Sequence, residues 1–161
     1  MEIQQMKSGL LQSAQTLAPP PGEVTSVFVA KSEGIAAKGN GLISARPDID
    51  KLIGPNNLQM AYDNNRNFAR FMISMFEQYQ PEVLVETVLW VFRAYRSHGF
   101  RTTYWAANIN IWVEMLREEL DTESFAAIYP FYNWLIVNIP VFTSLTDDLC
   151  MDEPQSAVEP H

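Results

Sequence analysis

The pattern that most limits the fold of this chain is a helical spacing of apolar residues through its second half. In residues 55–80 apolar side chains recur every three or four positions, at Leu58, Tyr62, Phe68, Phe71, Met72, Met75, Phe76 and Tyr79. The same spacing continues in residues 102–120 and 121–139. Because this spacing places the apolar side chains on one face of a helix, these segments predict several helices packed face to face.

Residues 82–98 lie between these segments and are apolar nearly all round, which predicts a central buried helix. Pro81 suits the first turn of this helix, where its missing N–H leaves no acceptor unpaired. Gly99 is expected to end the helix in the left-handed conformation.

The flanks of the later helices carry boundary signals too. Thr102 or Thr103 is expected to cap the next helix, and Asp121-Thr122 to open the last region. Pro130 is expected to kink or restart that last helix, and Pro140 to close it.

The N-terminal third is less regular. Residues 3–17 have helical spacing, and Pro19-Pro20-Pro21-Gly22 should end that helix. Residues 23–54 combine a strand-like segment with the turn signal Lys38-Gly39-Asn40-Gly41. They predict either a small hairpin or an irregular strap lying over the helices, and we favour the strap.

These patterns together predict an all-α fold, a globin-like helical bundle of five or six helices with an N-terminal helix and an irregular strap. We expect the N-terminal helix and strap in residues 1–45 and the helical domain in residues 46–146. Residues 147–161 are expected to form an acidic, disordered tail.

The charge of the chain argues against two classes of partner. It has 11 Lys and Arg against 19 Asp and Glu, and five of the acids lie in residues 147–161. An acidic body without a basic stripe is a poor match for nucleic acid or for an anionic membrane surface. The longest apolar-rich stretch, residues 128–142, is shorter than a membrane span, and the N-terminus lacks a secretory pattern, so we expect a cytoplasmic protein.

Residues that could carry catalysis or bind a metal are scarce. The chain has two histidines, one of which is its last residue, and a single cysteine, Cys150. It contains no nucleophile motif, phosphate-binding loop or metal-ligand spacing. We therefore expect no catalytic residue, no metal ligand and no enzymatic activity.

The aromatic residues are the most unusual feature. They are concentrated on consecutive predicted helices, and two interpretations stay open: a closely packed aromatic core, or an apolar ligand pocket with a few polar groups. The second interpretation makes the following residues candidates for ligand binding: Tyr95, His98, Trp105, Asn108, Trp112, Asn133 and Trp134.

Two details of residues 82–98 have alternative explanations. His98 could serve as an axial haem ligand above an aromatic cavity, but a helix C-terminal cap is the more common role of such a histidine. Glu86 and Arg93 share one stripe of the helix, either as a pair inside a pocket or as a solvated face, and we favour the solvated face.

The region from about residue 46 to residue 145 resembles the globin-like, non-haem sensor domains of bacterial stress-signalling proteins, including stressosome regulators. The resemblance rests on the segments Asp63-Asn64-Asn65-Arg66-Asn67-Phe68-Ala69, Trp90-Val91-Phe92-Arg93-Ala94-Tyr95-Arg96-Ser97-His98-Gly99-Phe100, Tyr104-Trp105 and Tyr132-Asn133-Trp134. It implies a homodimer that lacks catalytic groups and passes a signal to a partner protein. The chain departs from such domains in its extra N-terminal segment and in having no recognisable output domain.

These observations lead to one expected function and one alternative. We expect a non-enzymatic sensory or regulatory domain, without a cofactor, that binds a small apolar ligand or a partner protein and transmits a signal through helix packing. The alternative is a structural or interaction module with no ligand.

Overall fold

The computed structural model describes residues 2–147, and these residues form helices joined by short connections. The helices are α1 (Glu2–Ala14), α2 (Gly22–Ser44), α3 (Ile49–Ile53), α4 (Leu58–Glu77), α5 (Pro81–Ser97), α6 (Thr102–Glu119) and α7 (Thr122–Val137). A C-terminal helix, Ile139–Asp147, follows α7 at an angle of 43°. The all-α prediction is therefore confirmed, although residues 2–147 hold more helices than the five or six expected.

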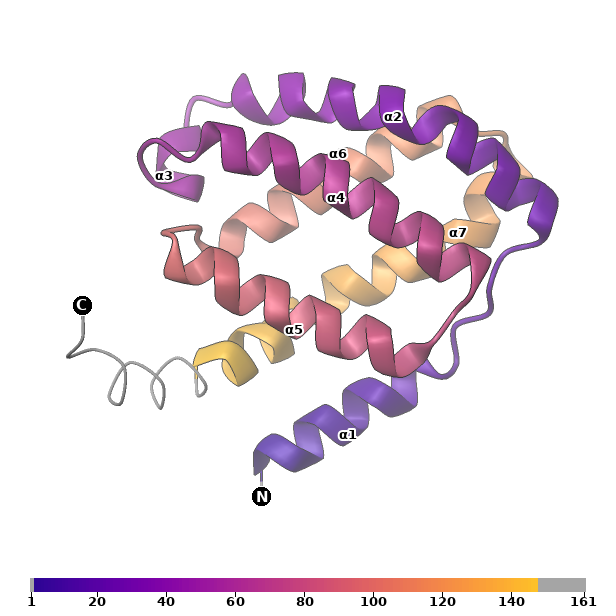
Figure 1. Ribbon diagram of the computed structural model, residues 1–161, viewed down its shortest axis with the longest axis horizontal. Coiled ribbons are helices and arrows are strands. Elements are labelled where there is room, and N and C mark those ends of the chain that lie inside the picture. The colour runs from indigo at the N-terminus through magenta and orange to yellow at the C-terminus, as the bar shows by residue number, and fades with distance from the viewer. Residues whose placement is uncertain (1, 148–161) are drawn as a thin grey trace.

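The helices enclose one shared core. In Figure 1, α4 and α5 face the viewer, α6 and α7 lie behind them, and α1 lies beside α5. The long helix α2 packs along both α4 and α6, and α6 packs on α7. The largest fully buried side chains include Trp112 and Tyr104 of α6 and Phe28 of α2.

The prediction of an irregular strap or hairpin after residue 22 is wrong, because α2 continues to Ser44. Its buried residues recur at helical spacing: Val24, Thr25, Phe28, Ser32, Ile35, Ala36, Gly39 and Ile43. The glycines and β-branched residues that suggested turns and strands lie in a helix because packing against α4 and α6 outweighs their weak local preferences.

Gly39 explains how α2 approaches its neighbours so closely. A Cβ atom at this position would lie 3.2 Å from Cε of Met115 and 3.5 Å from Nδ2 of Asn65. The missing side chain therefore lets α2 contact both α4 and α6, and the supposed turn signal is a packing site.

Helix α5 begins and ends as its sequence indicates, but it is not the central helix. Pro81 occupies its first turn and Gly99 follows it with φ of 103°. Val83 and Trp90 are exposed by 39% and 63%, so α5 buries one face only and the prediction of an all-round buried helix is wrong. The more deeply buried helix is α6, which contributes eight buried residues.

The boundaries of the last helices differ in part from the sequence prediction. Arg101, not a threonine, precedes α6, and its backbone N–H donates to the carbonyl of Leu52 at 2.8 Å. Asp121 caps α7 as expected, accepting a hydrogen bond from the backbone N–H of Ser124. Helix α7 continues through Pro130 without restarting, and Pro140 lies in the first turn of the C-terminal helix instead of closing α7.

The domain boundary expected at residue 45 falls between α2 and α3, yet α2 belongs to the same core as α4 and α6. The tail prediction falls almost entirely outside the described residues. Only Asp147 of that segment is described, and it lies in the C-terminal helix.

Candidate ligand-binding cavity

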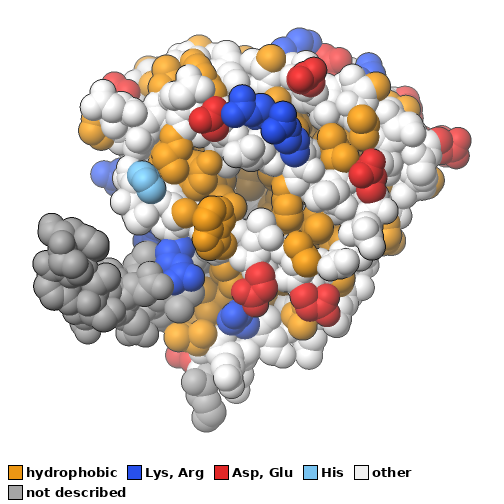
Figure 2. Space-filling view, viewed as in Figure 1, with side chains coloured by type: hydrophobic (Ala, Val, Ile, Leu, Met, Phe, Trp, Pro, Cys, Tyr) orange, Lys and Arg blue, Asp and Glu red, His pale blue; other side chains and the backbone are white. Residues whose placement is uncertain are grey.

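A cavity of about 250 Å³ lies between α4 and α5. Helices α6 and α7 form its floor, and Figure 2 shows the hollow near the middle of this face, bordered by apolar side chains. The residues that line it are Asn64, Asn67, Phe68, Phe71, Thr87, Val88, Trp90, Val91, Phe92, Tyr95, Trp105, Asn108, Ile109 and Leu135. The cavity is open to the surface, as Figure 2 shows, and Trp90 of its wall is 63% exposed.

The directions of two aromatic side chains explain why this space stays open. Phe68 of α4 packs edge-on against Trp112, with ring centroids 5.3 Å apart. Phe92 of α5 stacks on Trp105 at 4.8 Å and meets Phe142 at 5.2 Å. Because the two phenylalanine rings pack against different neighbours, they line the space between α4 and α5 without filling it.

A buried polar network lies beside the cavity and joins α2, α4 and α6. The Oδ1 atom of Asn65, a fully buried residue, accepts hydrogen bonds from Asn108 Nδ2 at 2.8 Å and from Trp112 Nε1 at 2.9 Å. Its Nδ2 atom donates to Asn40 Oδ1 at 2.9 Å. This network fixes how the three helices sit relative to each other next to the cavity wall.

Two polar atoms of the wall residues lack a protein partner in the described part of the chain. They are the Nε1 donor of Trp105 and the Oδ1 acceptor of Asn108, and both residues are more than nine-tenths buried. An unsatisfied buried donor or acceptor costs about 1–3 kcal/mol. The two residues are three positions apart on α6 and therefore share one face of that helix.

The cavity wall carries no charged side chain. Burial raises the pKa of the Tyr95 hydroxyl above its ordinary value, and the nearby carboxylate of Asp63 raises it further. The phenol of Tyr95 is therefore neutral at physiological pH. Among the described residues the wall is uncharged, and Asp63 is ion-paired with Arg66 at 3.1 Å, so the site favours neutral ligands over charged ones.

Three of the seven candidate binding residues are brought together at the cavity. Tyr95, Trp105 and Asn108 all line it. The rings of Tyr95 and Trp105 pack edge-on with centroids 5.5 Å apart, so these two side chains form one continuous part of the wall.

The other four candidates lie elsewhere. Trp112 is fully buried in the core, and Trp134 donates to Ser13 Oγ at 2.8 Å, which joins α7 to α1. Asn133 is exposed on α7. His98 is exposed at the end of α5, where its Nδ1 lies 2.9 Å from the carbonyl oxygen of Ala94. His98 therefore has the position of a helix cap and does not line the cavity, which leaves the haem alternative without geometric support.

Sequence reasoning missed the whole α4 side of the wall: Asn64, Asn67, Phe68 and Phe71. The available signal was the pair Asn64-Asn65 within an amphipathic helix, because buried amides need partners. Asn64 is 5% exposed and donates from Nδ2 to the hydroxyl of Tyr104 at 3.0 Å. Burial strongly raises the pKa of that Tyr104 hydroxyl, so it stays a neutral partner.

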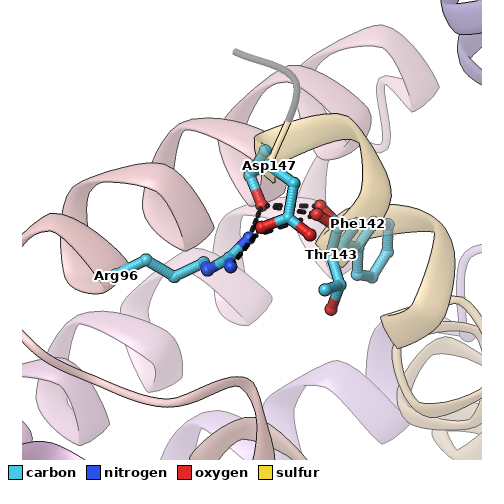
Figure 3. A network of polar contacts seen from close by, with 5 residues as sticks. Arg96, Phe142, Thr143 and Asp147 are labelled. Carbon is cyan, nitrogen blue, oxygen red and sulfur yellow. Dashed lines mark hydrogen bonds and ion pairs between the residues drawn. The ribbon is translucent and has the colours of Figure 1, made fainter. Parts of the chain in front are cut away.

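The wall helix α5 is joined to both terminal helices. Near its start, Glu86 pairs with Lys7 of α1 at 3.3 Å, and its side chain is 67% exposed, as expected for a solvated face. Near its end, Arg96 donates from Nη1 to the carbonyl of Thr143 at 3.1 Å and to Thr146 Oγ1 at 2.9 Å. Arg96 also forms an ion pair with Asp147, so it clamps the C-terminal helix onto α5 (Figure 3).

Within residues 2–147, no group of three or more His, Cys, Asp or Glu side chains could hold a metal ion. No single helix in that range is long and apolar enough to cross a membrane, although the bent pair of α7 and the C-terminal helix reaches that length together. Comparisons with protein-family models, curated proteins and solved structures give no match. The resemblance to globin-like sensor domains stays a prediction.

Proposed function

We propose that this chain is a non-enzymatic regulatory domain that binds a small apolar ligand between α4 and α5 and passes the binding event on through α5. The observation that carries the proposal is the cavity of about 250 Å³ with a mostly apolar wall. An apolar cavity of about 150 Å³ is enough to bind benzene, so this one has room for a somewhat larger molecule.

The position of α5 supports the signalling part of the proposal. Six residues of α5 line the cavity: Thr87, Val88, Trp90, Val91, Phe92 and Tyr95. The same helix holds α1 through Glu86 and the C-terminal helix through Arg96. A ligand that favours a slightly different position of α5 therefore changes how both terminal helices pack, provided that it binds the two arrangements with different affinity.

Toluene provides a direct test of the cavity. We expect toluene at ten times its Kd to stabilise the protein by about 1.4 kcal/mol, which raises Tm by roughly 3–6 °C. Differential scanning calorimetry measures the shift. Hydrogen exchange should change at the same time in residues 139–147, since these residues are clamped to α5.

A matched pair of variants on α5 controls for the site. Val88→Phe places a larger side chain in the cavity wall, whereas Val83→Phe makes the same change at a 39% exposed position outside it. Val83→Phe should keep the toluene response and Val88→Phe should lose it, with Val91→Phe as the substitute if Val88→Phe fails to fold. Absence of toluene binding, or equal binding to both variants, contradicts the proposal and favours an interaction module without a ligand.

A further inference from the structure

The two unpaired polar atoms of the cavity wall narrow the chemistry of the ligand. We infer that the cavity takes an uncharged, mainly apolar molecule with one hydroxyl or a similar group that both donates and accepts a hydrogen bond. This inference rests on the proposed function and names the ligand class of the same site.

The side-chain amide of Asn108 has one paired and one unpaired branch. Its Nδ2 atom donates to Asn65, which lies outside the cavity wall. The other branch of the planar amide, Oδ1, has no partner among the described residues, although Asn108 is 1% exposed and lines the cavity. A ligand group that donates a hydrogen bond would complete this amide.

Trp105 carries an unpaired hydrogen-bond donor, which complements the unpaired acceptor of Asn108. Phe92 stacks on its ring face, Tyr95 and Tyr104 pack against it edge-on, and its Nε1 donor is left without a partner. Trp105 is 6% exposed and lines the same cavity. An indole N–H can only donate, so it needs an acceptor, and a hydroxyl can accept from it while donating to Asn108.

Neighbouring protein atoms cover both polar atoms, so a small displacement of side chains must accompany the contact. The remainder of the wall is apolar apart from Asn64, Asn67, Thr87 and Tyr95. None of the described wall residues is a cation that could balance a carboxylate or phosphate, and the charged neighbour of Tyr95, Asp63, is already ion-paired with Arg66. A charged ligand group would therefore be buried in this wall without a counter-ion, which disfavours an anionic ligand.

Toluene, p-cresol and 4-methylbenzoate share one apolar body and differ in one substituent, so they test this inference by calorimetric titration. We expect p-cresol to bind roughly 30-fold more tightly than toluene, as two added hydrogen bonds of ordinary net strength would give. We expect 4-methylbenzoate to bind more weakly than either. Anisole, which accepts but cannot donate a hydrogen bond, should lie between toluene and p-cresol.

Variants of the two residues assign the preference to its atoms. Trp105→Phe and Asn108→Leu should each reduce the p-cresol to toluene ratio at least threefold while toluene still binds. Trp134→Phe is the matched control, because its Nε1 is paired with Ser13 Oγ outside the Asn65 network and Trp134 does not line the cavity. That variant should keep the wild-type ratio, and a ratio that falls equally in Trp134→Phe contradicts the assignment.

The outcomes separate the two proposals. If toluene and p-cresol bind equally, or toluene binds more tightly, the ligand class is wrong while the apolar cavity remains. If none of the probes binds, the proposed function itself fails. If a variant does not fold, the order of affinities in the wild-type protein still decides the inference.

Discussion

Asn65 is the residue on which the polar interior depends most. Its amide makes three hydrogen bonds, with Asn40, Asn108 and Trp112, and so joins α2, α4 and α6 inside a mainly apolar core. Each bond is modest in net terms, but removing a shared partner leaves several buried groups unsatisfied. The network therefore contributes more to a unique arrangement of helices than its individual bonds suggest.

Replacing this amide gives a prediction for stability. Asn65→Leu should lower the free energy of unfolding by roughly 2–4 kcal/mol, because three polar atoms lose their partner and two of them, on Asn108 and Trp112, are buried. Urea unfolding followed by circular dichroism measures the change. Asn67→Leu, two positions away and exposed, is the control and should leave stability within about 0.5 kcal/mol of wild type. Equal effects of the two substitutions would show that the network is not stabilising.

The glycines of α2 have different roles. A Cβ atom at Gly34 or Gly41 would meet no atom within 4 Å, whereas one at Gly39 would press on Met115 and Asn65. The first two glycines therefore weaken the helix without a packing benefit, and the third permits close contact between helices.

This difference predicts opposite effects of substitution within one helix. Gly34→Ala and Gly41→Ala should each raise the free energy of unfolding by about 0.5–1 kcal/mol, since alanine favours the helix. Gly39→Leu should lower it by roughly 1–3 kcal/mol, because the larger side chain forces α2 away from α6. Urea denaturation of the three variants checks the signs. A stable Gly39→Leu protein would argue against the close packing of α2.

The elements also show how far the sequence could predict this structure. Helices α4, α5, α6 and α7 could be predicted because their apolar residues repeat at helical spacing and prolines or glycines mark several of their ends. Helix α2 could not, because its glycines carry the local signature of turns and only contacts with α4 and α6 make it helical. Local preference is a weak guide where tertiary packing decides the outcome.

The cavity was predictable only in part. The polar and aromatic residues at 105 and 108 share a face of α6, which sequence spacing reveals. The void itself depends on where the rings of Phe68 and Phe92 point and on the approach of α4 to α5, and neither follows from spacing. Trp112 and Trp134 could not be distinguished from wall residues for the same reason.

Three surface carboxylates have a lowered pKa in the folded protein. A hydrogen bond from Lys38 lowers the pKa of Glu119, and one from Arg46 lowers the pKa of Asp48. The backbone N–H of Ser124 is the main cause of the lowered pKa of Asp121. Each folded-state pKa lies below its unfolded value, so these carboxylates stabilise the fold above the unfolded pKa values. That contribution is lost as the pH falls through the folded values.

The protein should therefore lose stability on acidification below about pH 4.5, the ordinary glutamate value. Urea unfolding at pH 7, 5 and 3 measures the loss. Asp121→Ala should be less stable than wild type at pH 7, and the difference should shrink at pH 3 as the wild-type carboxyl becomes protonated. A difference that persists unchanged at pH 3 would show that the charge of Asp121 is not what stabilises the start of α7.

The uneven burial of the four tryptophans has an optical consequence. Trp105, Trp112 and Trp134 are at most 6% exposed, whereas Trp90 is 63% exposed at the rim of the cavity. An aqueous quencher such as iodide should therefore quench the fluorescence of Trp90 and leave that of the three buried tryptophans unchanged. Trp90 therefore contributes the long-wavelength part of the tryptophan emission. A ligand in the cavity should change that part of the emission, so binding can be followed without an added dye.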